Sequence, residues 1–402
     1  MSILLHQSGV ILGINISLAD FFCMYILFYI ILSKNLTLPI APLLFFLIVT
    51  VLVLIAAVFF IPYFMSINIH PRSILSDYIK LVAIFVYFIV GFNIAKLNLI
   101  EKLMKSYTIF GIFIGIIGLL STILNIRLFS QLYYGGTRFK GLMIDPNYFS
   151  VIQITALVFI SRSHILKNKY KVLAELTISF SILASGSKTG AITLFIYLIL
   201  RILEIIIIKK KKLSLVILHL FFIVLIISLF PVYSVYLKQL INLATGSVPS
   251  LERVSSLFTD FGEAISEGGS GRDTTWKVAL QVIQSSPFIG VGIGTYTSYA
   301  SEMFNYNNVA HNTYLQLAAE WGIPLTIMIF SYIFFLLIKS TKRQILVNNE
   351  IPIILRDIII VLLIGSLSIS LNNARILWLC LGAMAFLMGR KGINNDEYKT
   401  RM

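Results

Sequence analysis

The side chains best suited to chemistry lie in one polar interval of an otherwise apolar sequence, residues 238–312. The interval is rich in Gly, Ser, Asn and carboxylate residues, and it ends in His311 and Asn312. A stretch this polar must lie in water or line a wet cavity. A lone histidine at the start of an apolar run is usually structural. Many cations lie on the same side of the membrane as His311, however, so we expect a functional role for it. We therefore expect the chemistry of the chain in this interval.

A second polar segment, residues 131–147, carries Arg138 and Lys140 in a turn bounded by glycines. These two cations could meet an anionic ligand at a membrane surface. The segment ends in an Asp-Pro-Asn turn, at residues 145–147, which is typical of the start of a helix. A plain helix start and a ligand site both explain these residues, and the sequence leaves the two open.

A third polar segment, residues 185–190, is a tight turn of small residues around one cation, Lys188. Lys188 could simply be solvated, or it could bind a phosphate beside the backbone N–H groups of a helix N-terminus. The segment does not fit a nucleotide P-loop, because its glycine spacing differs and no strand precedes it.

Within the long interval, residues 270–285 are predicted to form an amphipathic helix. Ser270 and Asp273 resemble a capping box at its start. Helical spacing places one set of side chains on an apolar face, namely Trp276, Ala279, Leu280 and Ile283, and another on a polar face, namely Lys277, Gln281 and Gln284. Such a helix lies at the membrane interface, with Trp276 near the headgroups and Arg272 facing a cavity or headgroups.

Pro287 should end this helix, and a tight turn with close backbone approach should follow at Gly290, Gly292 and Gly294. In the next apolar run Asn312, Gln316 and Glu320 are spaced i, i+4, i+8, so they form one polar stripe along a helix. A carboxylate two turns into a membrane span is costly without a partner. We expect Glu320 to contact an arginine or a hydroxyl of a neighbouring helix.

Composition indicates an integral membrane protein. Of 402 residues, 58% are hydrophobic and 12% charged, and the mean hydropathy is +0.92. Soluble domains have about a quarter of their residues charged. The net charge of +15 falls in short clusters between apolar runs, which is the pattern that orients a membrane protein, so no nucleic-acid partner is expected.

The apolar runs predict an all-α polytopic protein with about 11 transmembrane helices, or 12 if segment 3–16 also crosses, since about 20 residues span the bilayer. The runs lie near residues 10–32, 40–62, 79–95, 107–125, 147–161, 172–187, 189–208, 213–237, 313–338, 353–371 and 375–389. One integral domain is expected. Residues 1–237 would hold transmembrane helices 1–8, residues 238–312 a large extracytoplasmic loop with its interfacial helix, and residues 313–402 the last helices and a cytoplasmic tail.

The distribution of Lys and Arg predicts which side each loop faces. Most of these residues lie in alternate loops, among them the cluster Lys209–Lys212 just before the span that leads into the long interval, and such loops are cytoplasmic. The three polar segments then face outward. Arg201 lies within a span, one turn before Glu204, and is expected to pair with it or to extend to the interface.

Metal and redox sites are not expected. No histidine is spaced with another His or Cys as in a zinc site, and Cys23 and Cys380 both lie inside apolar spans. No cofactor is predicted. Direct use of a nucleotide outside the cell is implausible, so chemistry there needs a substrate that is already activated, such as a lipid-linked sugar pyrophosphate.

The sequence resembles the bacterial O-antigen ligase and O-antigen/capsule polymerase superfamily, the Wzy-C type. The family pattern is R-x3-W-x2-A, then P-x2-G-x-G, then H-N-x2-L with E-x-G downstream. It is present here as Arg272, Trp276 and Ala279; Pro287, Gly290 and Gly292; and His311, Asn312, Leu315, Glu320 and Gly322. A Pro146-Asn147 span entry and an outer turn of small residues also match, although that turn ends in Lys188 where the family commonly has arginine.

The resemblance implies a membrane glycosyltransferase of the bacterial inner membrane, with an extracytoplasmic active site and an undecaprenyl-pyrophosphate-linked glycan as donor. A polymerase would extend another lipid-linked repeat unit, for O-antigen, capsule or exopolysaccharide; a ligase would transfer the glycan to lipid A core of lipopolysaccharide. Arg272 and His311 would be catalytic, the first on the leaving pyrophosphate and the second as base. The expected substrate-binding residues are Arg138, Lys140, Asn147, Lys188, Arg253, Trp276, Lys277, Asn312 and Glu320.

Membrane lipids, a chain-length regulator and a flippase are the expected partners. A transporter or flippase of lipid-linked sugars is the alternative from another class. Such a protein would place its charges at mid-membrane in broken helices, often with internal repeats. The late polar loop favours the enzyme.

Overall fold

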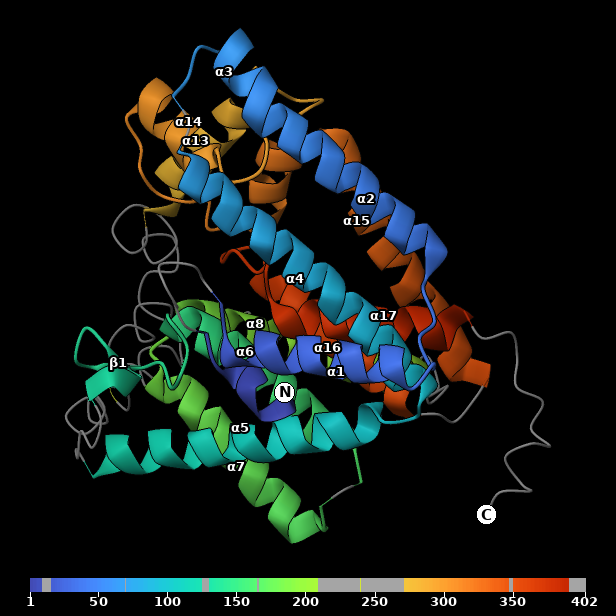
Figure 1. Cartoon of the computed structure of the whole chain (residues 1–402). Coiled ribbons are helices and arrows are strands. Elements are labelled where there is room, and N and C mark those ends of the chain that lie inside the picture. The colour runs from blue at the N-terminus through green and yellow to red at the C-terminus, as the bar shows by residue number, and fades with distance from the viewer. Residues whose placement is uncertain are drawn as a thin grey trace.

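The computed structural model describes residues 1–8, 16–68, 70–124, 130–164, 166–208, 239, 271–346 and 350–389. Over these residues the fold is helical, apart from one hairpin of two short antiparallel strands, β1 (Tyr133–Tyr134) and β2 (Arg138–Phe139) (Figure 1). The α-helices are α1 (Leu18–Leu32), α2 (Ile40–Ile55), α3 (Ile61–Phe64), α4 (Pro71–Lys96), α5 (Ile100–Ile123), α6 (Pro146–Arg162), α7 (Asn168–Ala184), α8 (Lys188–Ile208), α13 (Arg272–Ser285), α14 (Tyr296–Phe304), α15 (Thr313–Leu346), α16 (Glu350–Gly365) and α17 (Arg375–Gly389).

The prediction of an all-α membrane protein is confirmed. Four helical stretches are long and apolar enough to cross a bilayer, namely Ile40–Phe64, Pro71–Lys96, Ile100–Thr122 and Thr313–Lys342. The first of them joins α2 and α3 through a π-helical turn, η2 (Ala56–Phe60). Shorter helices occupy the other predicted runs, except 213–237, which lies outside the described residues. Segment 3–16 starts with a 3₁₀-helix, η1 (Ser2–His6). The total of 11 or 12 crossings stays a prediction.

Helices α4 and α17 pack with their backbones in contact. A Cβ atom on Gly91 would lie 2.1 Å from the carbonyl oxygen of Leu379, and one on Gly382 would lie 2.0 Å from that of Phe88. Small residues at such a crossing are typical of helix pairs in membranes, because dispersion contacts between backbones replace the hydrophobic effect. These two glycines therefore allow α4 and α17 to approach each other closely.

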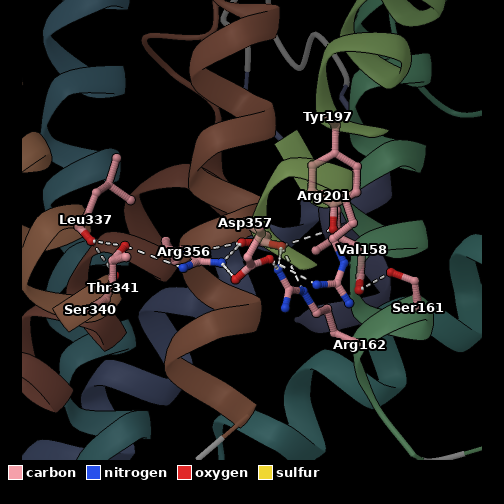
Figure 2. Close-up of polar contacts among 11 residues, drawn as sticks. Val158, Ser161, Arg162, Tyr197, Arg201, Leu337, Ser340, Thr341, Arg356 and Asp357 are labelled. Atoms are coloured by element: carbon pink, nitrogen blue, oxygen red, sulfur yellow. Dashed lines mark hydrogen bonds and ion pairs between the residues drawn. The ribbon is translucent and has the colours of Figure 1, made fainter. Parts of the chain in front are cut away.

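A buried network of charged side chains joins three further helices (Figure 2). It contains Arg162 of α6, Tyr197, Arg201 and Glu204 of α8, and Arg356 and Asp357 of α16. Asp357 accepts a bond from Arg162 Nε at 2.8 Å and pairs with Arg356 at 2.8 Å. Arg356 also pairs with Glu204 at 2.6 Å. The expected pair between Arg201 and Glu204 is confirmed, at 3.0 Å.

Helix α15 is broken at Gly322, whose φ of 78° and ψ of 161° are not helical. The loop after α13 fills the break with backbone hydrogen bonds: Val291 N to Ala319 O at 2.8 Å, Gly292 N to Glu320 O at 2.9 Å and Ile323 N to Pro287 O at 2.8 Å. Broken membrane helices need such substitutes for the bonds that they lose. The loop thereby fixes α13 and α14 against one end of α15, where α2 and α4 also end (Figure 1).

The predicted glycine turn is confirmed, and its cause is this close packing. Gly290, Gly292 and Gly294 all have φ between +70° and +82°. A Cβ on Gly292 would lie 2.3 Å from Ala57 N of the π-helical turn, and one on Gly294 would lie 2.6 Å from Ser73 O. No side chain fits at either position.

Candidate active site at the start of α8

Two of the polar segments predicted from the sequence meet at the turn before α8. Arg138 is buried, and it donates from Nε to the carbonyl oxygen of Ser185 at 3.0 Å and from Nη2 to Asn147 Oδ1 at 3.2 Å. Ser187 donates to the same Asn147 oxygen at 2.8 Å and accepts a bond from Gly190 N at 2.9 Å. Arg138 and Asn147 are thus fixed beside the first turn of α8.

The third polar segment reaches the same turn from α13. Arg272 is the first residue of that helix, and its Nη2 donates to Thr189 Oγ1 at 3.0 Å. Ser368, from the turn between α16 and α17, donates to the same hydroxyl oxygen at 3.1 Å. Thr189 is buried, so its hydroxyl holds the guanidinium at the start of α8 in a defined position.

His311 lies directly before α15 in the left-handed backbone conformation, with φ at 46°. The residue is partly exposed, and its ring makes no hydrogen bond within the described part of the chain. It is close enough to Arg272 and Asp145 to interact with both charges. Partial burial and the positive charge of Arg272 lower the pKa of His311, and the carboxylate of Asp145 opposes them. The ring is therefore neutral at pH 7 and able to accept a proton.

The residues after His311 anchor it to the α16–α17 turn. Asn312 caps α15, because its Oδ1 accepts from Tyr314 N at 2.9 Å and Leu315 N at 3.1 Å. Its Nδ2 donates to Leu367 O at 3.0 Å. Thr313 N donates to Ser366 O at 2.9 Å. The two catalytic candidates thus share one support, since Ser368 of the same turn reaches Arg272 through Thr189.

The other predicted site residues differ in how they relate to this cluster. Lys188 is half-buried as the first residue of α8, beside Thr189. Lys140 is half-buried, and its backbone N–H donates to Leu132 O. Lys277 is exposed on α13, without a described contact to the cluster. Trp276 is half-buried, and its indole nitrogen has no partner among the described residues. Arg253 lies outside them.

The prediction that Glu320 contacts an arginine or a hydroxyl of a neighbouring helix is wrong for the described contacts. The predicted polar stripe is confirmed, but among the described contacts Glu320 Oε1 accepts from Gln316 Nε2 of the same helix, at 2.7 Å. Asp77 and Lys80 of the neighbouring helix α4 interact electrostatically with Glu320. One helical turn suffices for a glutamine to reach a carboxylate, so no arginine from another helix is needed.

Two details of α13 are also corrected. Its N-cap is Gly271, with φ at 58° and a carbonyl that accepts from Thr275 Oγ1 at 2.8 Å, whereas Ser270 of the predicted capping box lies outside the described residues. Its buried face is made of Thr275, Val278, Ala279, Val282 and Ile283, whereas Leu280 is exposed. The predicted face was rotated, because α13 packs against α14 and α15 through its valines. The helix ends before Pro287 as predicted, and α14 was not predicted.

Three supporting residues were missed. Thr189 follows Lys188 in the predicted turn, so the polarity of that turn was a usable signal. Ser368 had none, because it falls in the predicted span 353–371, whereas α16 ends at Gly365. Asp145 was assigned only to the helix start, and it does cap α6 through Asn147 N and Tyr148 N while acting on His311.

The cluster is rich in positive charge and in fixed donors. Arg138, Lys188 and Arg272 lie around the N-terminus of α8, and the carboxylate of Asp145 acts on His311. A helix N-terminus itself favours an anion. Among the described residues, no three His, Cys, Asp or Glu side chains group as a metal site would need. The arrangement can bind an anionic group at the start of α8, and the neutral imidazole of His311 can accept a proton nearby.

Comparison with known families supports an assignment. The family model described as O-antigen ligase, Wzy_C, matches residues 173–330, which include Lys188, Arg272 and His311. Members of this family are membrane glycosyltransferase-like enzymes that act on lipid-linked glycans. No curated protein matches the chain. This match over residues 173–330 confirms the resemblance of the chain to the O-antigen ligase and polymerase superfamily.

Proposed function

We propose that the protein is a polymerase of oligosaccharide repeat units linked to undecaprenyl pyrophosphate, with its active site on the outer face of the bacterial inner membrane. The observation that carries the proposal is the convergence of Arg272 and His311 with Arg138 at the start of α8. The family match supports the reaction class. A chain-length regulator and a flippase stay the expected partners.

The donor pyrophosphate would bind at the N-terminus of α8. Arg272 would contact it while keeping its bond to Thr189, since a guanidinium has five N–H donors. Lys188 and Arg138 would add positive charge from the same turn. Preorganised cations of this kind stabilise charge that develops on a leaving group. Asn312 would support the site and not contact the substrate, because its side chain caps α15.

In the transfer step, a hydroxyl oxygen of the acceptor sugar would form a bond to the anomeric carbon of the donor. The bond between that carbon and the phosphate oxygen breaks, and undecaprenyl pyrophosphate leaves with the electron pair. The proton of the acceptor hydroxyl passes to His311. A neutral imidazole suits this role, and partial burial together with the positive charge of Arg272 lowers the pKa of His311, so that the ring is neutral near pH 7.

A ligase is the second candidate, and the description of the matching family favours it. The same donor site and base would then serve lipid A core as acceptor. The two activities differ in the acceptor alone.

Gel analysis of surface polysaccharide from a strain that lacks the protein tests the proposal. The polymerase predicts loss of the ladder while a single repeat unit still reaches its acceptor. Accumulation of lipid-linked polymer, with no glycan on the acceptor, would establish the ligase. An unchanged polysaccharide would contradict both and favour the transporter.

The pH dependence of transfer should follow His311. The neutral ring is the active form and its pKa is lowered, so activity should be full at pH 7 and fall only as the pH drops below the ordinary imidazole pKa of about 6.5. Arg272→Gln removes the neighbouring positive charge and should move this acid limb of the residual activity to higher pH. Asp145→Asn removes a negative charge that raises the pKa of His311, so it should move the acid limb to lower pH. Asparagine is also a good N-cap residue, so α6 should keep its cap. Rate profiles from pH 5 to pH 8 measure both shifts, and shifts of the opposite sign would contradict the assignment.

The hydroxyl of Thr189 should matter for the rate. Thr189→Val keeps the shape of the side chain but removes the acceptor for Arg272. A hydrogen bond to a charged group contributes about 1.5–3 kcal/mol, so a loss of roughly 10- to 100-fold in kcat is expected. Thr189→Ser keeps the acceptor and should stay within a few-fold of wild type. Equal activity of the two variants would show that Thr189 does not position Arg272.

A further inference from the structure

We infer that Gln316 and Glu320 form a positioning pair for His311, so that the carboxylate two turns into α15 acts on the reaction through the protein and not on the substrate. The inference rests on the proposed role of His311 as base. It assigns a function to the polar stripe of α15, whose members are all buried.

The pair is connected to His311 through the backbone. The N–H of Ala310, directly before His311, donates to Gln316 Oε1 at 3.0 Å. The amide of Gln316 then donates from Nε2 to Glu320 Oε1 at 2.7 Å. Ala310 is fully buried, and Gln316 and Glu320 are each 5% exposed. The backbone directly before His311 is therefore held in place by the hydrogen bond from Ala310 to Gln316.

His311 needs this anchoring because its backbone conformation is unfavourable. Residues other than glycine rarely adopt a positive φ, and they hold it only where the surrounding structure fixes them. Asn312 and Thr313 fix the chain after His311, and Gln316 fixes it before. The ring itself makes no hydrogen bond to the described residues, so the backbone on both sides sets its position.

Glu320 determines which way the amide of Gln316 points. The backbone N–H of Ala310 needs an acceptor, Oε1 of Glu320 accepts a hydrogen bond, and the amide of Gln316 supplies one acceptor and one donor. With Glu320 present, Nε2 faces the carboxylate and Oε1 faces Ala310. Without the side chain of Glu320, the amide is free to turn its NH₂ group toward the N–H of Ala310, which breaks the hydrogen bond that holds the loop. Glu320 is itself fixed beside the break in α15, since its carbonyl accepts from Gly292 N at 2.9 Å.

A swap of the two side chains tests the inference. Gln316→Glu alone places two carboxyl groups side by side and should lower kcat by roughly 100-fold, the scale of a misplaced catalytic group. The double variant Gln316→Glu with Glu320→Gln restores one acceptor for Ala310 and one donor–acceptor bond within the pair. It should recover kcat to within a few-fold of wild type. The KM for the lipid-linked donor should stay unchanged in both.

The control is Gln284→Glu, which alters an exposed glutamine on α13 and should leave kcat unchanged. All rates are normalised to the folded protein recovered by size exclusion. Full activity of Gln316→Glu, or failure of the swap to recover any kcat in folded protein, would overturn the positioning role. Failure of the proposed base shows separately, as retained activity in His311→Asn.

Discussion

His311→Asn is expected to lower the rate of glycan transfer by roughly 10²–10⁴-fold, the usual contribution of a general base, with normal amounts of folded protein. Two features separate the chemical effect from a structural one. The residue is partly exposed and its ring makes no hydrogen bond to the described residues, so its loss leaves no hydrogen-bonding group without a partner. Asparagine tolerates the left-handed backbone that His311 adopts, so the turn before α15 should persist.

The rate should be measured with purified protein, and the amount of folded protein in membranes should be measured in parallel. His311→Ala serves as a second variant and should lose at least as much activity. Near-normal transfer by His311→Asn would show that the imidazole is not the base. Loss of protein equal to the loss of activity would instead assign His311 a structural role.

The largest effect on stability is expected at Asp357, at the centre of the ion-pair network in Figure 2. Its carboxylate is 4% exposed, pairs with both Arg162 and Arg356, and accepts a bond from Tyr197 at 3.1 Å. Asp357→Asn leaves two buried guanidinium groups short of negative charge. Breaking a buried pair costs about 3–5 kcal/mol, so the variant should unfold at a much lower temperature.

Thermal unfolding of the purified protein in detergent measures this loss. The control is Glu350→Gln, which breaks an exposed pair with His164 whose two side chains are 48% and 86% exposed. Exposed pairs contribute little, so this variant should unfold at the wild-type temperature. If both variants behaved alike, the network would not stabilise the packing of α6, α8 and α16.

The helices were predictable because hydropathy and period act locally. Long apolar runs such as 40–62 and 79–95 leave no alternative to a helix in a bilayer, and the structure has α2 to α4 there. The rotation of α13 was not predictable from spacing, because Val278 and Val282 compete with Trp276 and Leu280 for the buried face. The helices that α13 packs against decide that choice.

The motif residues of the site were predictable, but its supports were not. Arg272 and His311 were found from residue type and place in the chain. Their meeting depends on tertiary contacts between segments that are far apart, such as Arg272 with Thr189 and Thr189 with Ser368. The partner of Glu320 was missed for a different reason: Gln316 was seen as a member of the stripe and not as a donor.

The most direct test of the proposed activity is transfer by the purified protein in lipid nanodiscs. The substrate is a single repeat unit on undecaprenyl pyrophosphate, and the products are separated by mass. Wild-type protein is expected to give lipid-linked glycans of two or more repeats together with free undecaprenyl pyrophosphate, and Arg272→Ala and His311→Asn are expected to form both products at a rate lower by roughly 100-fold or more. Chain growth that is equally fast with these two variants would contradict the active site at the start of α8.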